Sequence, residues 1–261
     1  MKICSLYSGS RGNAVFMECG GAKLLIDAGK SVRALKNALA EIGESVSELD
    51  AILITHEHCD HVSALESLHE EKGIPIHAPG GCAEKLATLP SPYIQTNLVC
   101  HTPLFSVEIN GTKITSFPTS HDSACSVGYR IEWEENGEMR RIGYATDLGY
   151  VSDDVMTGLS HCEAVVLEAN HDVEMLMNGP YPYHLKQRIL SRRGHLCNAD
   201  SALLCVKLAE MGTKHILLAH ISDKNNHPAI AYDEVLSAVG DRLLSLAVAD
   251  AKLPTRLVWE L

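Results

Sequence analysis

The chain has 261 residues, of which 46% are hydrophobic and 21% charged, the ordinary composition of a globular protein that can bury a full core. Its net charge of −11 argues against a broad basic surface for nucleic acid. The sequence has no apolar run of about 18 residues, and its early Ser-Gly turn interrupts any signal peptide, so we expect no membrane span. The nine cysteines form no Cys-x-x-Cys pair, which favours reduced thiols and a cytoplasmic location.

Strands and helices alternate in the first third of the chain. We expect strands at residues 2–7, 14–18, 23–27, 51–55 and 74–78, a helix that Ser31 caps and that ends at Ile42, and further helices at 62–72 and 81–87. A Gly- and Ser-rich turn spans residues 8–13, and residues 91–102 give no clear prediction.

The remaining elements predict hairpins followed by more alternation. We expect hairpins of 104–109 with 113–118 and of 127–133 with 141–146, strands at 164–167, 215–219 and 256–260, a helix capped by Asp200 that ends at Met211, and a helix over 231–246. No linker or strong internal repeat divides the chain, so we expect one α/β domain over residues 1–261.

The segment AILITHEHCDH carries the strongest chemical signal. Its apolar strand leads into His56, His58, Asp60 and His61, four possible metal ligands within six positions. Side chains alternate along extended chain, so the first three can converge while Cys59 points away. A sharp turn into the next helix would bring His61 to the same place. The pattern predicts a metal site in preference to a run of surface histidines.

Six acidic or histidine side chains stand at or just beyond the ends of predicted strands. They are Asp27, His56, His121, Asp147, Glu168 and His220. Strand ends gather at one edge of an α/β sheet, so we expect these side chains to meet there. Asp27 is either a turn residue or a carboxylate that orients the histidine cluster. Glu168 is a candidate for the same orienting role, and His171 is either an extra ligand or a residue at a helix start.

A local basic segment interrupts the acidic chain, since no acidic residue lies between Glu174 and Asp200. It is either a solvated face or an anion-binding rim beside the metal site. The candidate phosphate contacts in it are Lys186, Arg188, Arg192, Arg193 and Asn198.

The ordered series Asp27, His56-x-His58-x-Asp60-His61, His121, Asp147 and His220 resembles the metallo-β-lactamase superfamily. The segments SGSRGNA, LEANHD and RRGHLCNADSA make the chain similar to the YycJ/WalJ-type group within it. The resemblance implies a four-layer αββα sandwich with two divalent metal ions between the sheets. It implies that one metal is bound by His56, His58 and His121, that the second is bound by Asp60, His61 and His220, and that Asp147 bridges them. Such N and O donors fit zinc, manganese or iron, and the sequence does not choose.

For this group the resemblance implies a DNA exonuclease that acts 5′ to 3′ on double-stranded ends through a metal-bridging hydroxide. Asp60, where lactamases carry Cys, is the pattern of phosphodiesterases and thioester hydrolases. His195 resembles the His of an HST-type segment that faces the scissile phosphate, although Leu196 and Cys197 replace its Ser and Thr. We therefore expect Asp60 and His195 to be catalytic, with His195 protonating the leaving oxygen.

Other functions remain open on the same fold. A thioester or lactone hydrolase of the glyoxalase II type would use the same metals, and it would not need the basic segment. A di-iron oxidoreductase or a binding module without catalysis are further alternatives, although the complete ligand set argues against the last. The expected partner is nucleic acid, DNA more than RNA, and no protein partner is implied.

Overall fold

The computed structural model describes residues 1–70 and 73–257. One sheet contains β1 (Lys2–Tyr7), β2 (Ala14–Cys19), β3 (Ala22–Ile26), β4 (Ala51–Leu53), β5 (Ile76–Pro79), β6 (Leu98–His101) and β14 (Thr255–Leu257). The other contains β7 (Ser106–Ile109), β8 (Thr112–Pro118), β9 (Val127–Glu135), β10 (Glu138–Ala145), β11 (Ala164–Glu168), β12 (His215–Ala219) and β13 (Ser245–Val248).

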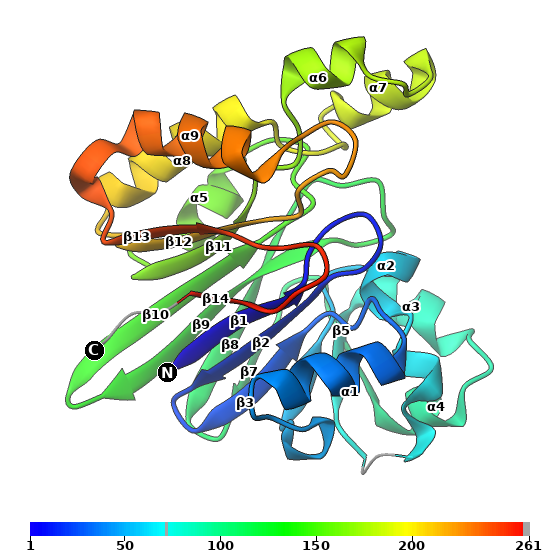
Figure 1. Cartoon of the computed structure of the whole chain (residues 1–261). Helices are drawn as coiled ribbons and strands as arrows, with labels where there is room; N and C mark the ends of the chain where they lie inside the picture. The colour runs from blue at the N-terminus through cyan, green and yellow to red at the C-terminus, as the bar shows by residue number, and fades with distance from the viewer. Residues whose placement is uncertain (71–72, 258–261) are drawn as a thin grey trace.

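Most helices flank these two sheets on their outer faces, and those within residues 173–189 lie beyond the strand ends (Figure 1). The helices are α1 (Val32–Glu41), α2 (Cys59–Val62), α3 (Gly80–Ala87), α4 (Pro92–Asn97), α5 (Asp153–Leu159), α6 (Val173–Asn178), α7 (Tyr183–Ile189), α8 (Asn198–Glu210) and α9 (Pro228–Val239). The strand orders are β14-β1-β2-β3-β4-β5-β6 and β13-β12-β11-β10-β9-β8-β7. The predicted four-layer αββα sandwich is confirmed.

The central strands β4, β11 and β12 are mostly apolar because both of their faces are buried. In β1, Ile3 packs between the sheets, whereas Cys4 packs toward the helices outside the first sheet. In β12, Leu217 faces the space between the sheets and Leu218 faces the α5, α8 and α9 side. Alternation along the strands therefore feeds three apolar layers.

Two predicted helices differ from the observed ones. The expected helix over 62–72 is the short α2 followed by a 3₁₀ turn at Leu65–Glu70, and residues 71–72 lie outside the described part. The expected helix over 231–246 begins at Pro228 and ends at Val239, because Gly240 turns the backbone to a φ of 57° and the following segment joins the sheet as β13.

The cap of α8 and the last strand also need correction. Cys197, not Asp200, caps α8, and its sulfur accepts the N–H of Asp200 at 3.5 Å. The last strand begins at Thr255, and the end of the predicted strand, at residues 258–260, lies outside the described residues. All nine cysteines are free thiols that form no disulfide within the described part of the chain. Within the described ranges, no helix is both long and apolar enough to cross a membrane.

Gly29 lies where three segments of the future site meet. Asn13 N–H donates to the Asp60 carbonyl at 2.8 Å, and Gly29 N–H donates to the Asn13 carbonyl at 2.9 Å. A Cβ at Gly29 would lie 1.6 Å from the backbone oxygen of Asp60 and 2.7 Å from the backbone nitrogen of Asn13. The loop that carries the histidines can therefore approach β3 only because residue 29 has no side chain.

We predict that Gly29→Ala lowers the free energy of unfolding by about 3 kcal/mol or more, since rigid backbone cannot yield to the added methyl group. Gly212→Ala is the control, because nothing lies within 4 Å of its Cβ and only its φ of +104° is unfavourable. That control should lose about 1 kcal/mol. Urea denaturation measures the free energy of unfolding of both variants. If Gly29→Ala loses no more stability than Gly212→Ala, the close approach of the Asp60 backbone to residue 29 is contradicted.

Candidate metal centre

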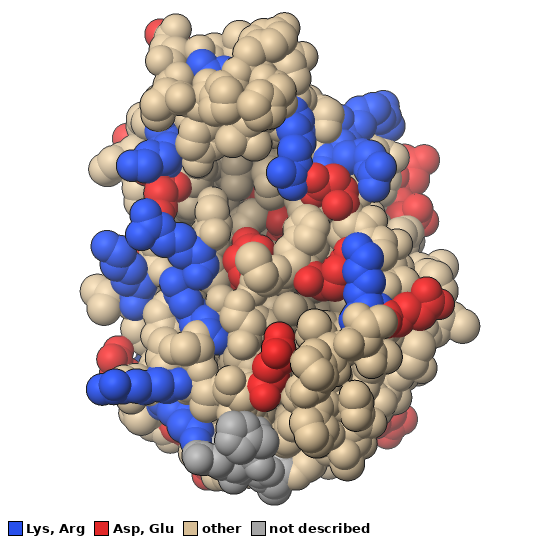
Figure 2. Space-filling model, turned by 90° about the vertical axis from the view of Figure 1, so that its right-hand side faces the viewer, with Lys and Arg blue, Asp and Glu red and all other residues tan. Residues whose placement is uncertain are grey.

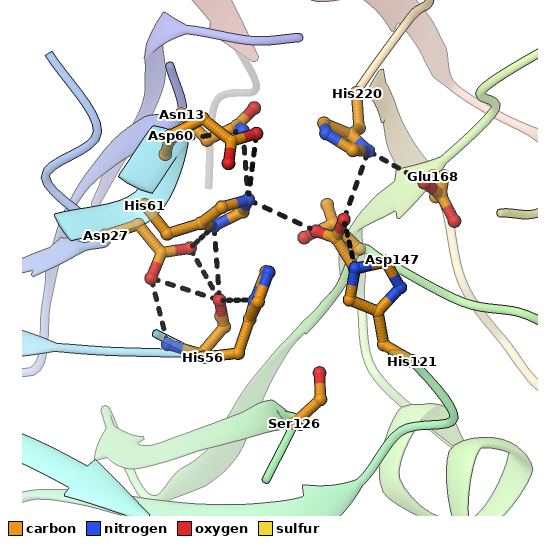
Figure 3. Close-up of polar contacts among 12 residues, drawn as sticks. Asn13, Asp27, His56, Asp60, His61, His121, Ser126, Asp147, Glu168 and His220 are labelled. Atoms are coloured by element: carbon orange, nitrogen blue, oxygen red, sulfur yellow. Dashed lines mark hydrogen bonds and ion pairs between the residues drawn. The ribbon is translucent and has the colours of Figure 1, made fainter. Parts of the chain in front are cut away.

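The polar side chains predicted to meet come from the ends of strands in both sheets (Figure 3). Asp27 directly follows β3, and the segment from β4 into α2 carries His56, His58, Asp60 and His61. From the second sheet, His121 follows β8, Asp147 follows β10, Glu168 ends β11 and His220 follows β12. The site therefore lies where the two sheets present their strand ends to each other.

The structure brings all seven predicted ligands together in overlapping groups. Within each group the donor atoms lie within 4.8 Å of one another, and the groups are His56 with His58 and His121, Asp60 with His61 and His220, and His56 with His61 and Asp147. A fourth group joins Asp147 to Glu168, His195 and His220. Asp147, His56, His61 and His220 each belong to two groups, and the Asp147 carboxylate lies 3.5 to 3.7 Å from ring nitrogens of His61, His121, His195 and His220.

Several donor atoms at this centre are buried without a hydrogen-bond partner. They include Nε2 of His56, Nε2 of His220 and Oδ2 of Asp147. Burying such groups unpaired costs free energy, and a cation that accepts their lone pairs removes that cost. Nitrogen and oxygen donors without a thiolate suit a divalent cation such as zinc, manganese or iron. The residues present therefore fit divalent metal binding.

The pKa shifts of the carboxylates and histidines at the centre also favour cation binding. Burial would raise the pKa of Asp147, but the imidazoles of His220, His61, His121 and His56 hold it well below its usual range. Burial would lower the pKa of His61 and His220, yet Asp27 and Asp147 raise the first to about 9, and Asp147 and Glu168 raise the second to about 10. The carboxylates thus draw positive charge to the centre, and a divalent cation can supply it in place of protons.

Asp27 and Thr55 fix the orientation of two histidines. Asp27 Oδ2 lies 2.8 Å from His61 Nδ1, and Asp27 also accepts the N–H and the hydroxyl of Thr55, each at 2.9 Å. The Thr55 hydroxyl lies 3.0 Å from His56 Nδ1. Both Nδ1 atoms are therefore engaged, which fixes the orientation of each ring and directs its Nε2 toward the donor groups. Sequence reasoning missed Thr55, although its place directly before the first histidine was a usable signal.

Two further residues that sequence reasoning missed come from the Gly- and Ser-rich turn after β1. The hydroxyl oxygen of Ser8 accepts the backbone N–H of His220 at 2.6 Å. The side-chain amide nitrogen of Asn13 lies 3.1 Å from His61 Nε2. The turn therefore holds residues from both sheets in place.

Glu168 contacts two histidines and two loops. Its Oε1 lies 2.8 Å from Nδ1 of both His195 and His220, and its Oε2 accepts the N–H of Leu148 at 2.7 Å and of Leu196 at 3.0 Å. Burial would raise the pKa of Glu168, but His195 and His220 lower it. Its position matches the orienting role considered from the sequence.

An open cleft of about 290 Å³ leads to the donor groups. Its lining includes Asp60, Asp147, His195 and His220, and Tyr181 and Arg188 contribute to it from α7 and the turn before it. The side chain of His195 is 20% exposed. Figure 2 shows the hollow on this face, with acidic side chains inside it and Lys and Arg side chains around it.

The predicted phosphate contacts divide into different environments. Arg188 is the sole Lys or Arg among the described residues that line the cleft, and it pairs with Asp122 at 2.5 Å. Arg193 Nε donates to the carbonyl of His121 at 3.4 Å, at the edge of the site. Lys186 lies outside the cleft lining and donates to the carbonyl of Met177 at 2.6 Å.

Asn198 and His171 belong to none of the donor groups among the described residues. Asn198 is buried at the start of α8 and exchanges hydrogen bonds of 3.0 and 2.8 Å with Asn226, so its prediction as a phosphate contact is wrong. His171 precedes Asp172, the N-cap of α6, and burial lowers its pKa to about 4. It belongs to none of the donor groups among the described residues, which favours the helix-start interpretation.

Comparison with known proteins places this geometry in a family. A model described as the beta-lactamase superfamily domain matches residues 22–221. The chain is 34% identical to exodeoxyribonuclease YycJ of Bacillus anthracis over 97% of both chains. It is 35% identical to exodeoxyribonuclease WalJ of Streptococcus pneumoniae over 95% of this chain and 91% of the relative.

The solved structures agree on the fold. The metallo-β-lactamase fold protein YhfI of Bacillus subtilis superposes with a TM-score of 0.68 at 18% identity over 99% of both chains. The chain therefore belongs to the metallo-β-lactamase superfamily of metal-dependent hydrolases, in the group of the YycJ and WalJ exodeoxyribonucleases.

Proposed function

We propose that this protein is a metal-dependent phosphodiesterase that degrades DNA as an exonuclease, releasing nucleotides from the 5′ ends of duplexes. The observation that carries the proposal is the convergence of N and O donors around Asp147 at the floor of an open cleft. The names of the two relatives that align over nearly the whole chain support DNA as the substrate.

The donor groups are arranged to hold two divalent cations, zinc or manganese being suited to the ligands. We assign one to His56, His58 and His121, and the other to Asp60, His61 and His220, with Asp147 between them. When bound, such a pair lowers the pKa of a shared water and offsets charge on the phosphate oxygens. The chain itself holds these donor side chains in place, because they are anchored at the ends of strands in both sheets.

His195 is positioned to move the proton that the leaving oxygen requires. Its Nδ1 is engaged by Glu168 at 2.8 Å, so Nε2 is the nitrogen left for the cleft. A leaving alkoxide needs a proton in the transition state, and an imidazole at the cleft wall can donate it. Glu168 stabilises the imidazolium and holds the ring in one orientation.

Arg188 is the cation best placed to bind the substrate backbone. It reaches the cleft from α7 and is paired with the carboxylate of Asp122, whose side chain is 26% exposed. A phosphodiester that enters the cleft can replace that carboxylate as its partner, since guanidinium binds phosphate oxygens in the same geometry. The acidic surroundings confine such contacts to the neighbourhood of the metal centre.

The direct test is hydrolysis of end-labelled duplex DNA, single-stranded DNA and RNA by metal-free protein supplied with Mn²⁺ or Zn²⁺. We expect stepwise release of mononucleotides from duplex 5′ ends, lost in His58→Ala and retained in His184→Ala, which changes an exposed histidine of α7. Release from 3′ ends would contradict the polarity. Turnover of a thioester or lactone without cleavage of any nucleic acid would contradict the function.

We further predict that His195→Ala lowers kcat on DNA by about 10²- to 10⁴-fold, the usual contribution of a general acid. On a p-nitrophenyl phosphodiester of thymidine the loss should stay below about tenfold, because nitrophenolate leaves without a proton. His184→Ala is again the control. Equal losses on both substrates would show that His195 does not protonate the leaving group.

A further inference from the structure

A second groove lies on the other side of the loop that carries His195. It has a volume of about 240 Å³, and Leu196, Leu204 and the ring of Tyr150 line it. Leu203, which also lines it, is 63% exposed. His195 lines the catalytic cleft, and the next residue in the chain, Leu196, lines this groove. The cleft and the groove are therefore neighbours.

The groove is held at a fixed position relative to the metal centre. Ser120 Oγ donates to the carbonyl of Arg192 at 2.7 Å, and Gly149 N–H donates to the carbonyl of Ser120 at 2.8 Å. A Cβ at Gly149 would lie 2.1 Å from the Arg192 carbonyl oxygen, so these backbones are in close contact. Ser120 and Gly149 adjoin His121 and Asp147 in the chain, which ties the groove wall to two of the proposed ligands.

Tyr150, one of the residues that line the groove, has the cation of Arg192 stacked on its ring. The guanidinium carbon of Arg192 lies 3.8 Å from the centroid of the Tyr150 ring, which places the cation against the ring face. Nucleobases stack on aromatic rings and on guanidinium planes alike. Lys207 adds a second cation at the groove, and Asp200 is the carboxylate there.

We propose that this groove binds a nucleobase of the DNA substrate, adjacent to the nucleotide whose phosphate lies at the metal centre. Three features favour a base over other occupants: the stacked ring and guanidinium, the apolar leucine floor, and cationic groups beside the cleft on a chain of net charge −11. The inference rests on the phosphodiesterase function proposed above and assigns Tyr150 the role of a substrate-binding residue.

The test compares Tyr150→Ala, Tyr150→Phe and Leu203→Ser with the wild-type protein on end-labelled duplex DNA and on bis(p-nitrophenyl) phosphate, which has no base. We expect Tyr150→Ala to raise KM for DNA about tenfold, the usual effect of losing one base stack, with kcat unchanged. Leu203→Ser should raise KM in the same direction, and Tyr150→Phe should match the wild type. Turnover of bis(p-nitrophenyl) phosphate should not change in any variant.

Abasic nucleotides locate the contact. One abasic position near the cleaved end should raise KM about tenfold for the wild type and have little effect in Tyr150→Ala, since both changes remove the same stack. If Tyr150→Ala has wild-type KM for DNA, or if it loses activity on both substrates equally, the groove does not bind a base. If the wild type hydrolyses bis(p-nitrophenyl) phosphate but no DNA, the proposed function itself fails, and the base site with it.

Discussion

The fold depends on burying carboxylates at the meeting point of two sheets. Asp147 and Glu168 are nearly inaccessible to solvent, and each lies among imidazoles that come from different strand ends. A buried charge without compensation costs several kcal/mol, of order that of a domain's whole stability when summed over a cluster. Compensation requires both sheets to present their histidines together, so the sandwich and the site require each other.

Backbone strain is concentrated at the same place. Asp27, Asp147 and His220 each directly follow or nearly follow a strand, and each has a positive φ, of 62°, 58° and 58°. Such conformations of non-glycine residues cost about 1–3 kcal/mol each, and they persist only where surrounding contacts fix them. The N–H of Thr55 donates to Asp27, and His220 is held by its backbone N–H bond to Ser8 and by the contact of its Nδ1 with Glu168. The strain turns side chains sharply out of the sheets and into the cleft.

Local patterns, apolar strands with polar residues at their ends, predicted an α/β domain and the gathering of the ligands. The resemblance to a known superfamily implied the four-layer sandwich. Thr55 was missed although it directly precedes His56, whereas Ser8 could not be identified, because its partner is fixed by tertiary packing and serine carries no metal signal. Asn198 was misassigned because sequence proximity to His195 does not show which way a helix-start side chain faces. The end of α9 was placed too late because apolar residues of β13 continue the helical pattern after Gly240.

The central claim, that Asp147 lies between two divalent cations, is tested most directly by anomalous diffraction from crystals of the protein loaded with Mn²⁺. We expect two anomalous peaks flanking Asp147, one ligated by His56, His58 and His121 and the other by Asp60, His61 and His220. A single peak, or peaks ligated by other residues, would contradict the assignment of the seven ligands.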